Sequence, residues 1–237
     1  MATAVAAPSG SEQRLPRRDW RTILVLLGSA FVVILNETIM NVALPRLMVE
    51  LNVSATTVQW LSTAFLLTMA VVIPMTGYVL QRLSTRSVFV LAMALFSLGT
   101  LVSGLAPSFV PLLIGRVVQA VGTAVMMPLL MTTILRLVPA YMRGRVLGTV
   151  SIVISVAPAL GPTVSGLILQ ALSWRFMFLL VLPIAIAALV VGRRLLEPDG
   201  ETRTGSLDAF SVVLATQDFK EGTSAFLEKR KPKFEGR

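Results

Sequence analysis

Long stretches without charged residues place the strongest constraint on how this chain can fold. No Asp, Glu, Lys or Arg occurs in residues 51–81, 87–115 or 146–174, which are runs of 31, 29 and 29 residues. A helix needs about 20 apolar residues to cross the hydrocarbon core of a bilayer. The chain is 55% hydrophobic and 14% charged, whereas soluble domains are about 25% charged. The sequence therefore predicts an all-α membrane protein and not a β-barrel, whose short strands would alternate in polarity.

The apolar pattern predicts six transmembrane helices joined by short loops. They cover residues 23–44, 58–80, 88–105, 110–135, 146–172 and 176–191. With the amino terminus inside, 11 arginines flank the inner ends of these spans, and only Arg46 and Arg175 lie outside. Cytoplasmic loops carry an excess of Lys and Arg, so both termini are predicted to be cytoplasmic. Trp20 and Trp174 begin spans, where indole rings favour the membrane interface.

Composition also narrows the chemistry and the partners that we expect. The net charge of +9 is explained by basic cytoplasmic loops, so no nucleic acid is expected as a partner, and the lipid bilayer is. There is no Cys and no His, which argues against disulfides, thiolate chemistry and a metal site, and no cofactor is predicted. Proton transfer near neutral pH would then fall to a carboxylate.

Two charged residues interrupt the predicted spans, Glu37 in the first and Arg116 in the fourth. A charge at the centre of a membrane helix costs roughly 2.5–3.5 kcal/mol on insertion scales, so such residues mark ion, proton or substrate pathways. Asn41 and Gln119 lie four and three residues further on, on the same helix faces. The first and fourth helices are equivalent if the six form a three-plus-three inverted repeat, as in half of many secondary transporters.

Several motifs together resemble one branch of a transporter family. Residues 35–45 read Leu-Asn-Glu-Thr-Ile-Met-Asn-Val-Ala-Leu-Pro, residues 116–122 Arg-Val-Val-Gln-Ala-Val-Gly, and residues 157–166 Ala-Pro-Ala-Leu-Gly-Pro-Thr-Val-Ser-Gly. They resemble the signatures of the fourteen-helix drug:proton antiporters of the major facilitator superfamily. The resemblance covers about residues 20–215, the amino-terminal half of that fold. Where the family has Asp this chain has Asn36, and its acid, Glu37, lies about 100° further around the helix.

The resemblance implies proton-coupled efflux of lipophilic, cationic compounds across the plasma membrane of a bacterium, and no enzyme activity. It implies that Glu37 is the group that takes up and releases protons and that Asn41 is its polar neighbour. It also implies that Arg116 and Gln119 form the polar surface of the facing helix. The residues alone also allow Glu37 and Arg116 to be structural. Two further sites are implied to serve conformational change: Gly161 and Pro162 in a bending helix, and Arg82 in a loop that latches the two halves.

The chain divides into four predicted regions: a cytoplasmic tail (1–20), six transporter helices (21–196), a polar linker with a truncated seventh helix (197–216), and a soluble tail (217–237). The last region resembles the carboxyl terminus of enoyl-CoA hydratase (crotonase) family proteins, without the upstream residues that hydratase activity requires. This favours a chain joined from two genes. The alternative to a working exporter is therefore a truncated half-transporter, inactive alone or dependent on a second half or a homodimer.

Overall fold

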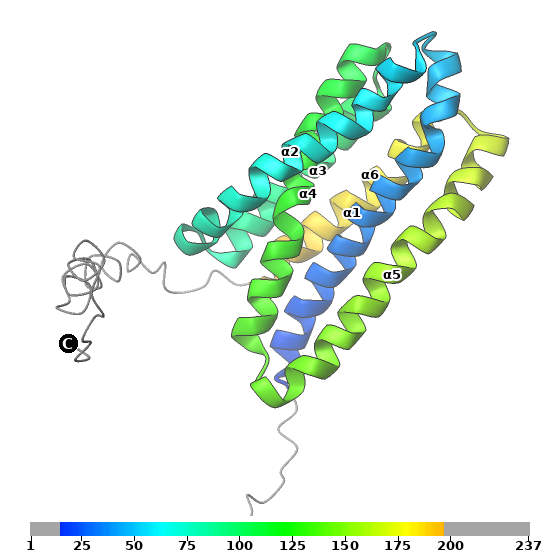
Figure 1. The fold of residues 1–237 in the computed structure, drawn as a ribbon. Helices are drawn as coiled ribbons and strands as arrows, with labels where there is room; N and C mark the ends of the chain where they lie inside the picture. Colours follow the sequence, from blue (N-terminus) through cyan, green and yellow to red (C-terminus); the bar gives the residue numbers. More distant parts are fainter. Residues whose placement is uncertain (1–14, 197–237) are drawn as a thin grey trace, which may run out of the picture.

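The computed structural model describes residues 15–196, which form six helices that are long and apolar enough to cross a membrane (Figure 1). The helices are α1 (Arg17–Glu50), α2 (Ala55–Arg82), α3 (Thr85–Gly104), α4 (Phe109–Leu137), α5 (Ala140–Ala171) and α6 (Arg175–Leu195). The six predicted spans are confirmed, and most helices run a few residues past the predicted ends. Of the predicted terminal regions, 1–14, 197–216 and 217–237 lie outside the described residues.

Polar side chains at the short loops satisfy the backbone groups that helix ends leave unpaired. Ser54 and Ser84 precede α2 and α3, and their hydroxyls accept hydrogen bonds from the backbone N–H of Thr57 (3.1 Å) and Ser87 (3.2 Å). Serine is a preferred residue at this N-cap position. At the end of α4, Arg143 donates to the carbonyls of Val138 (3.0 Å) and Leu135 (2.9 Å). Arg143, which lies in the first turn of α5, therefore ties this helix to the end of α4.

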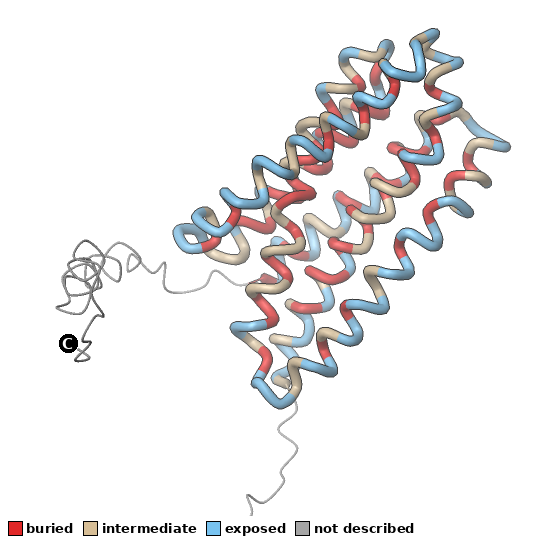
Figure 2. The backbone as a smooth tube through the Cα atoms, viewed as in Figure 1, coloured by how far each residue is buried: buried red, intermediate tan, exposed pale blue. Residues whose placement is uncertain are grey.

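Two helices, α1 and α4, form the centre of the bundle and contact each other. The first triplet of helices and the second pack reciprocally, because α1 lies against α5 while α4 lies against α2. The pairs α3–α4 and α1–α6 complete the same pattern. This arrangement matches the three-plus-three repeat predicted from the sequence, with α1 and α4 as equivalent helices. Buried residues concentrate along α1, α3 and α4 (Figure 2).

Along the seam between α3 and α4, glycines let two backbones approach closely. A Cβ atom at Gly99 would lie 2.5 Å from the backbone nitrogen of Gln119 and 2.6 Å from the carbonyl oxygen of Gly115. A Cβ at Gly122 would likewise lie 2.7 Å from the backbone nitrogen of Phe96. Small residues at such contacts are typical of helix association in lipid. This close approach determines at which position along α3 the side chain of Gln119 lies.

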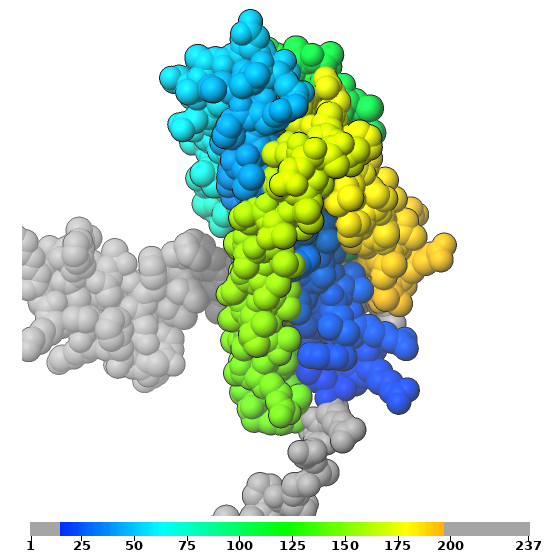
Figure 3. Space-filling view, turned by 90° about the vertical axis from the view of Figure 1, so that its right-hand side faces the viewer, coloured from blue at the N-terminus to red at the C-terminus, as the bar shows by residue number. Residues whose placement is uncertain are grey.

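The second helix of each triplet is the least covered part of the bundle. In the most apolar stretch of α2 only 17% of residues are buried, and in α5 only 22%, against 56% in both α3 and α4. Figure 3 shows α5 running along the surface beside α1. Both helices contain proline, Pro74 in α2 and Pro158 and Pro162 in α5, and each is nevertheless assigned as one continuous helix.

One interface prediction is wrong. Trp174 is 1% exposed, so its indole does not lie at the surface where a membrane-interface anchor would be. It packs edge-to-face against Phe178 with ring centroids 6.2 Å apart, and the Arg175 guanidinium lies 4.5 Å from its ring centroid. Burial of its large apolar area outweighs the preference of an indole for the interface. Trp20 is 38% exposed, as an interface residue requires.

Candidate functional site

A buried arginine on α4 is the centre of the candidate site. Arg116 is 1% exposed and Gln119 is fully buried. One terminal nitrogen of Arg116, Nη1, donates a 2.5 Å hydrogen bond to Oε1 of Gln119. The two residues were predicted to share a helix face, and the structure brings their side chains into contact. A buried guanidinium needs acceptors to offset the loss of water, and Gln119 supplies the first of them.

The hydrogen bonds continue from α4 into α3. Nε2 of Gln119 donates to Oγ1 of Thr100 at 2.7 Å, and that hydroxyl donates to the carbonyl oxygen of Phe96 at 2.6 Å. Each donor in this series therefore ends on an acceptor, and the amide of Gln119 cannot rotate without breaking a bond. The series holds the Oε1 atom toward Arg116. Thr100 was not predicted as a site residue, although Ser97, Thr100 and Ser103 recur every third residue on one face of an apolar helix.

Asn36, and not Glu37, is the α1 residue that faces Arg116. Nη1 of Arg116 lies 3.4 Å from Oδ1 of Asn36, a long hydrogen bond, and Asn36 is 2% exposed. Asn36 occupies the position where the resembled family carries its Asp. The contact across the two central helices is thus between a guanidinium and a neutral amide. Asn36 therefore contributes no negative charge to offset the guanidinium.

Glu37 lies one residue further around α1 and is only partly buried. Among residues 15–196 its carboxylate makes no hydrogen bond and no ion pair, although it interacts electrostatically with Arg116. The structure therefore leaves the only acid in the interior of a predicted span without a fixed partner and with part of its surface open. This geometry lets the carboxylate exchange a proton or meet a cation.

Asn41 makes its side-chain hydrogen bond to α2 and not to Glu37, although the two lie on the same side of α1. Asn41 is exposed, and its Oδ1 accepts a 2.9 Å hydrogen bond from Oγ of Ser62 on α2. This hydrogen bond links the carboxyl-terminal part of α1 to the amino-terminal part of α2.

Arg116 follows the first residue of α4 by only seven positions, so the site lies nearer the end of the bundle where α1 ends and α4 begins.

An aromatic ring on α2 covers the buried arginine. The Cζ atom of Arg116 lies 3.9 Å from the ring centroid of Phe65, which is 2% exposed. A guanidinium over an aromatic face is attracted by the ring quadrupole, most strongly where water is absent. Among the described residues Nε of Arg116 has no hydrogen-bond partner. No sequence pattern singles out Phe65, because one more aromatic residue in an apolar span is expected.

The predicted conformational residues are placed as follows. Gly161 of α5 is buried against α1, where an added Cβ would meet the Thr38 side chain, and Pro162 is exposed. One turn along, Oγ of Ser165 donates to the carbonyl oxygen of Ile39 at 3.2 Å. Arg82, at the exposed end of α2, places its guanidinium 4.6 Å from the ring centroid of Tyr78 on the same helix.

A bundle with this reciprocal packing, and with a buried arginine between its two central helices, has the architecture of half of a secondary transporter. The profile of the Major Facilitator Superfamily matches residues 26–233, and the chain belongs to that superfamily. It is 42% identical over 195 residues to the uncharacterized MFS-type transporter YcnB of Bacillus subtilis, covering 82% of this chain and 41% of YcnB. It is also 42% identical over 197 residues to the lincomycin resistance protein LmrB of Bacillus subtilis, covering 83% of this chain and 41% of LmrB.

Solved transporter structures show the same fold at low sequence identity. A D-xylose-proton symporter aligns with a TM-score of 0.68 and 17% identity, covering 86% of this chain and 53% of the symporter. A peptide transporter POT in complex with sulfate aligns with a TM-score of 0.69 and 13% identity, covering 93% of this chain and 46% of that chain. The described part of the chain is therefore half of a major facilitator fold in a multi-pass membrane protein. The chain spans about two fifths of the length of these curated relatives.

Proposed function

We propose that this chain carries the amino-terminal half of a proton-coupled exporter of lipophilic, cationic compounds in the bacterial plasma membrane, with both described ends cytoplasmic. The observation that supports this most is the state of Glu37: a partly open carboxylate with no hydrogen bond or ion pair in the described part of the chain. Relatives are named for lincomycin resistance and multidrug resistance, which supports drug efflux.

The charges of the site favour a cation as the transported compound. Arg116 is 1% exposed under Phe65, whereas Glu37 is partly exposed, so the accessible charge is negative when Glu37 is ionised. A lipophilic cation and a proton then compete for one carboxylate. Binding of the proton neutralises Glu37 and releases the cation, and loss of the proton restores the site. This competition is the simplest form of exchange.

The test uses purified full-length chain in proteoliposomes with an imposed pH gradient and a fluorescent lipophilic cation. We expect gradient-driven efflux that Glu37→Gln abolishes, because the amide cannot exchange a proton. The matched control is Glu50→Gln, which changes an acid of the same helix that pairs with Arg46 at 2.7 Å at the end of α1. Equal loss of flux in both variants, or undiminished flux in Glu37→Gln, refutes the proton-carrier role and favours a structural carboxylate.

A second candidate is a half-transporter that works only with a second half or a second copy of itself. The sparse cover of α2 and α5 favours it, because alternating access requires one half to rock against another around the site. Flux that appears only after co-reconstitution with the carboxyl-terminal half of LmrB supports this candidate. The crotonase-like tail at 217–237 has no proposed part in transport, and truncation before Gln217 is expected to leave flux unchanged.

A further inference from the structure

At the end of the bundle where α4 and α6 begin, one arginine bridges two connections of the chain. Arg175 is the first residue of α6, and its Nη2 donates a 3.1 Å hydrogen bond to the carbonyl oxygen of Ala106 in the α3–α4 loop. Ala106 is buried. The guanidinium of Arg175 also covers the ring of Trp174, which packs against Phe178. Arg175 therefore joins the start of α6 to the segment that leads into α4.

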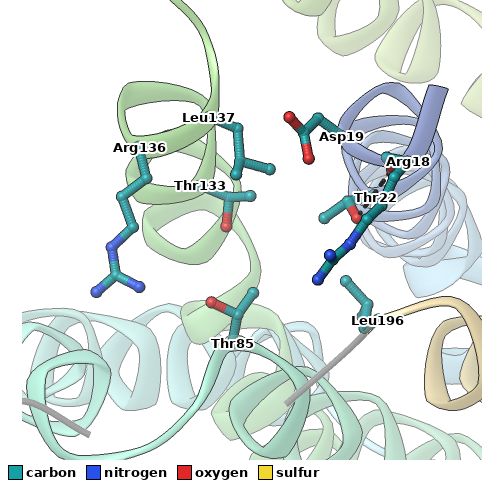
Figure 4. Close-up of a pocket in the computed structure, with 8 residues that line it drawn as sticks. All are labelled: Arg18, Asp19, Thr22, Thr85, Thr133, Arg136, Leu137 and Leu196. Atoms are coloured by element: carbon teal, nitrogen blue, oxygen red, sulfur yellow. Dashed lines mark hydrogen bonds between the residues drawn. The ribbon is translucent and has the colours of Figure 1, made fainter. Parts of the chain in front are cut away.

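A pocket lies between helix ends on the opposite side of the bundle. The starts of α1 and α3 and the end of α4 line it together with Leu196, and it encloses about 430 Å³, its open mouth included. Figure 4 shows Thr22, Thr85 and Thr133 of three different helices around this space. Neighbouring helix ends in this bundle therefore need not touch, and a side chain such as Arg175 is needed where they are joined.

Arg175 is also unusual in its place and in its partners. It is one of two arginines predicted on the outer side of the membrane, where Lys and Arg are less frequent than on the inner side. The other, Arg46, pairs with Glu50 one turn along the same helix. Among residues 15–196 Arg175 forms no ion pair, and its partners are a backbone carbonyl and an aromatic ring. Such partners indicate that Arg175 serves to place other elements.

Contacts continue from α6 to the turn of α1 that carries Glu37. Oγ of Ser165 on α5 lies 3.5 Å from Sδ of Met177 and donates to the carbonyl oxygen of Ile39 at 3.2 Å. All three residues are buried. Met177 follows Arg175 by two positions, and Ile39 follows Glu37 by two positions. A series of contacts therefore links the bridge at the start of α6, through α5, to the carboxylate of α1.

We propose that Arg175 is a positioning residue of the site, which sets the separation between Arg116 and Glu37 by holding the start of α4 against α6. Arg116 follows the first residue of α4 by seven positions, so a helix start that moves carries the guanidinium with it. Arg116 is the charged residue that interacts with Glu37, and the other charged residues of 15–196 lie near helix ends. Because Coulomb energy depends on distance, Arg175 controls how readily Glu37 exchanges a proton. Its part in transport rests on the proposed function, whereas its effect on helix placement does not.

The first test is the pH dependence of efflux, in the proteoliposome assembly that shows flux. In Arg175→Gln the proton concentration at half-maximal flux changes by about 2- to 30-fold, the range for changes along a contact network that touch neither ligand. Arg175→Lys keeps a donor for the Ala106 carbonyl and restores most of the profile. Arg46→Gln, at the other outer arginine, leaves the profile unchanged. An unchanged profile in Arg175→Gln, or an equal shift in Arg46→Gln, overturns the proposed role.

The second test measures helix placement directly and needs no transport. The chain has no cysteine, so Val42→Cys and Val110→Cys place one spin label each at exposed positions of α1 and α4. In the full-length chain in detergent, Arg175→Gln shifts or broadens the distance between the labels by about 1–2 Å, as helix shifts at interfaces do. Arg193→Gln, at an exposed arginine near the other end of α6, leaves it unchanged.

The two measurements separate this inference from the proposed function. If the label distance in Arg175→Gln equals that of the parent pair, Arg175 does not place α4 and the inference is wrong. If the distance changes while no assembly shows pH-driven flux, the proposed function fails and the positioning of α4 by Arg175 stands.

Discussion

At the scale of single residues, one side chain of α1 contacts Arg116 and another carries the accessible carboxyl group, although a single acid could do both. Asn36 approaches Arg116 with a neutral amide, at 3.4 Å, and the Glu37 carboxyl group lies on the neighbouring, partly open side of α1. An acid at position 36 would be held by the buried guanidinium, since charged hydrogen-bond partners bind more strongly than neutral ones. The neutral amide offers no negative charge to the Arg116 guanidinium. A carboxylate at position 36 would supply that charge, which leads to a stability prediction.

Asn36→Asp is expected to stabilise the protein. The carboxylate completes an ion pair with an arginine that is already buried, and a hydrogen bond to a charged group contributes about 1.5–3 kcal/mol. The unfolding midpoint in detergent, followed by tryptophan fluorescence, should rise by several degrees. Asn41→Asp is the matched control, because Asn41 is exposed and bonds to the hydroxyl of Ser62. A midpoint that falls in Asn36→Asp contradicts this account of the contact.

Phe65 makes a second prediction at the same scale. Phe65→Leu removes the ring face over Arg116 and keeps an apolar side chain, so the loss beyond simple packing should be about 0.5–2 kcal/mol, the strength of a cation–π contact. Phe96→Leu, a fully buried change on α3 with no arginine over its ring, measures the packing part alone. Both are read from denaturant unfolding. In an Arg116→Gln background the excess cost of Phe65→Leu should vanish, and an excess that persists there contradicts the cation–π contribution.

At the scale of helices, the α3–α4 seam determines where Gln119 meets Thr100. Gly99→Ala should destabilise the protein by about 1–3 kcal/mol, as overpacking does, because the added Cβ meets backbone atoms of α4 that cannot rotate away. Gly148→Ala, in α5, is the control, since nothing lies within 4 Å of its Cβ position. There the same change should stabilise the helix by about 0.5–1 kcal/mol. The two variants are expected to shift the unfolding midpoint in opposite directions, and two shifts of the same sign exclude this account of the seam.

The helices also show how far the sequence could predict this site. Hydropathy and helical periodicity predicted all six spans and the shared face of Arg116 and Gln119, because these depend on local spacing alone. The contact of Asn36 with Arg116 depends on how α1 is rotated against α4, which no local pattern determines. Phe65 contacts Arg116 only because α2 crosses α4 at the level of that arginine. The tertiary packing of neighbouring helices, and not their formation, was the missing information.

At the scale of the whole molecule, the exposed faces of the helices are of two kinds. The exposed residues of α6 are mainly large and apolar, such as Leu180 and Ile184, as lipid contact requires. The exposed face of α5 is mixed, with Gly148, Ser151 and Ser155 beside large apolar residues such as Ile152 and Leu167. Small and weakly polar residues are enriched where membrane helices pack against protein. From the small and polar exposed positions of α5, we propose that this helix faces a second half or a second copy, while α6 faces lipid.

This contrast gives a prediction about transport itself. In the proteoliposome assembly that shows pH-driven efflux, Gly148→Trp should reduce the flux by at least about tenfold, because a bulky ring on α5 blocks the approach of the facing half. The half-bundle itself should unfold at no lower a temperature, since nothing lies within 4 Å of the Gly148 Cβ position. Ile184→Trp places the same ring on α6, where lipid accommodates it, and should leave flux intact. If the two variants transport equally well, α5 is lipid-facing and the two-body mechanism fails for this chain.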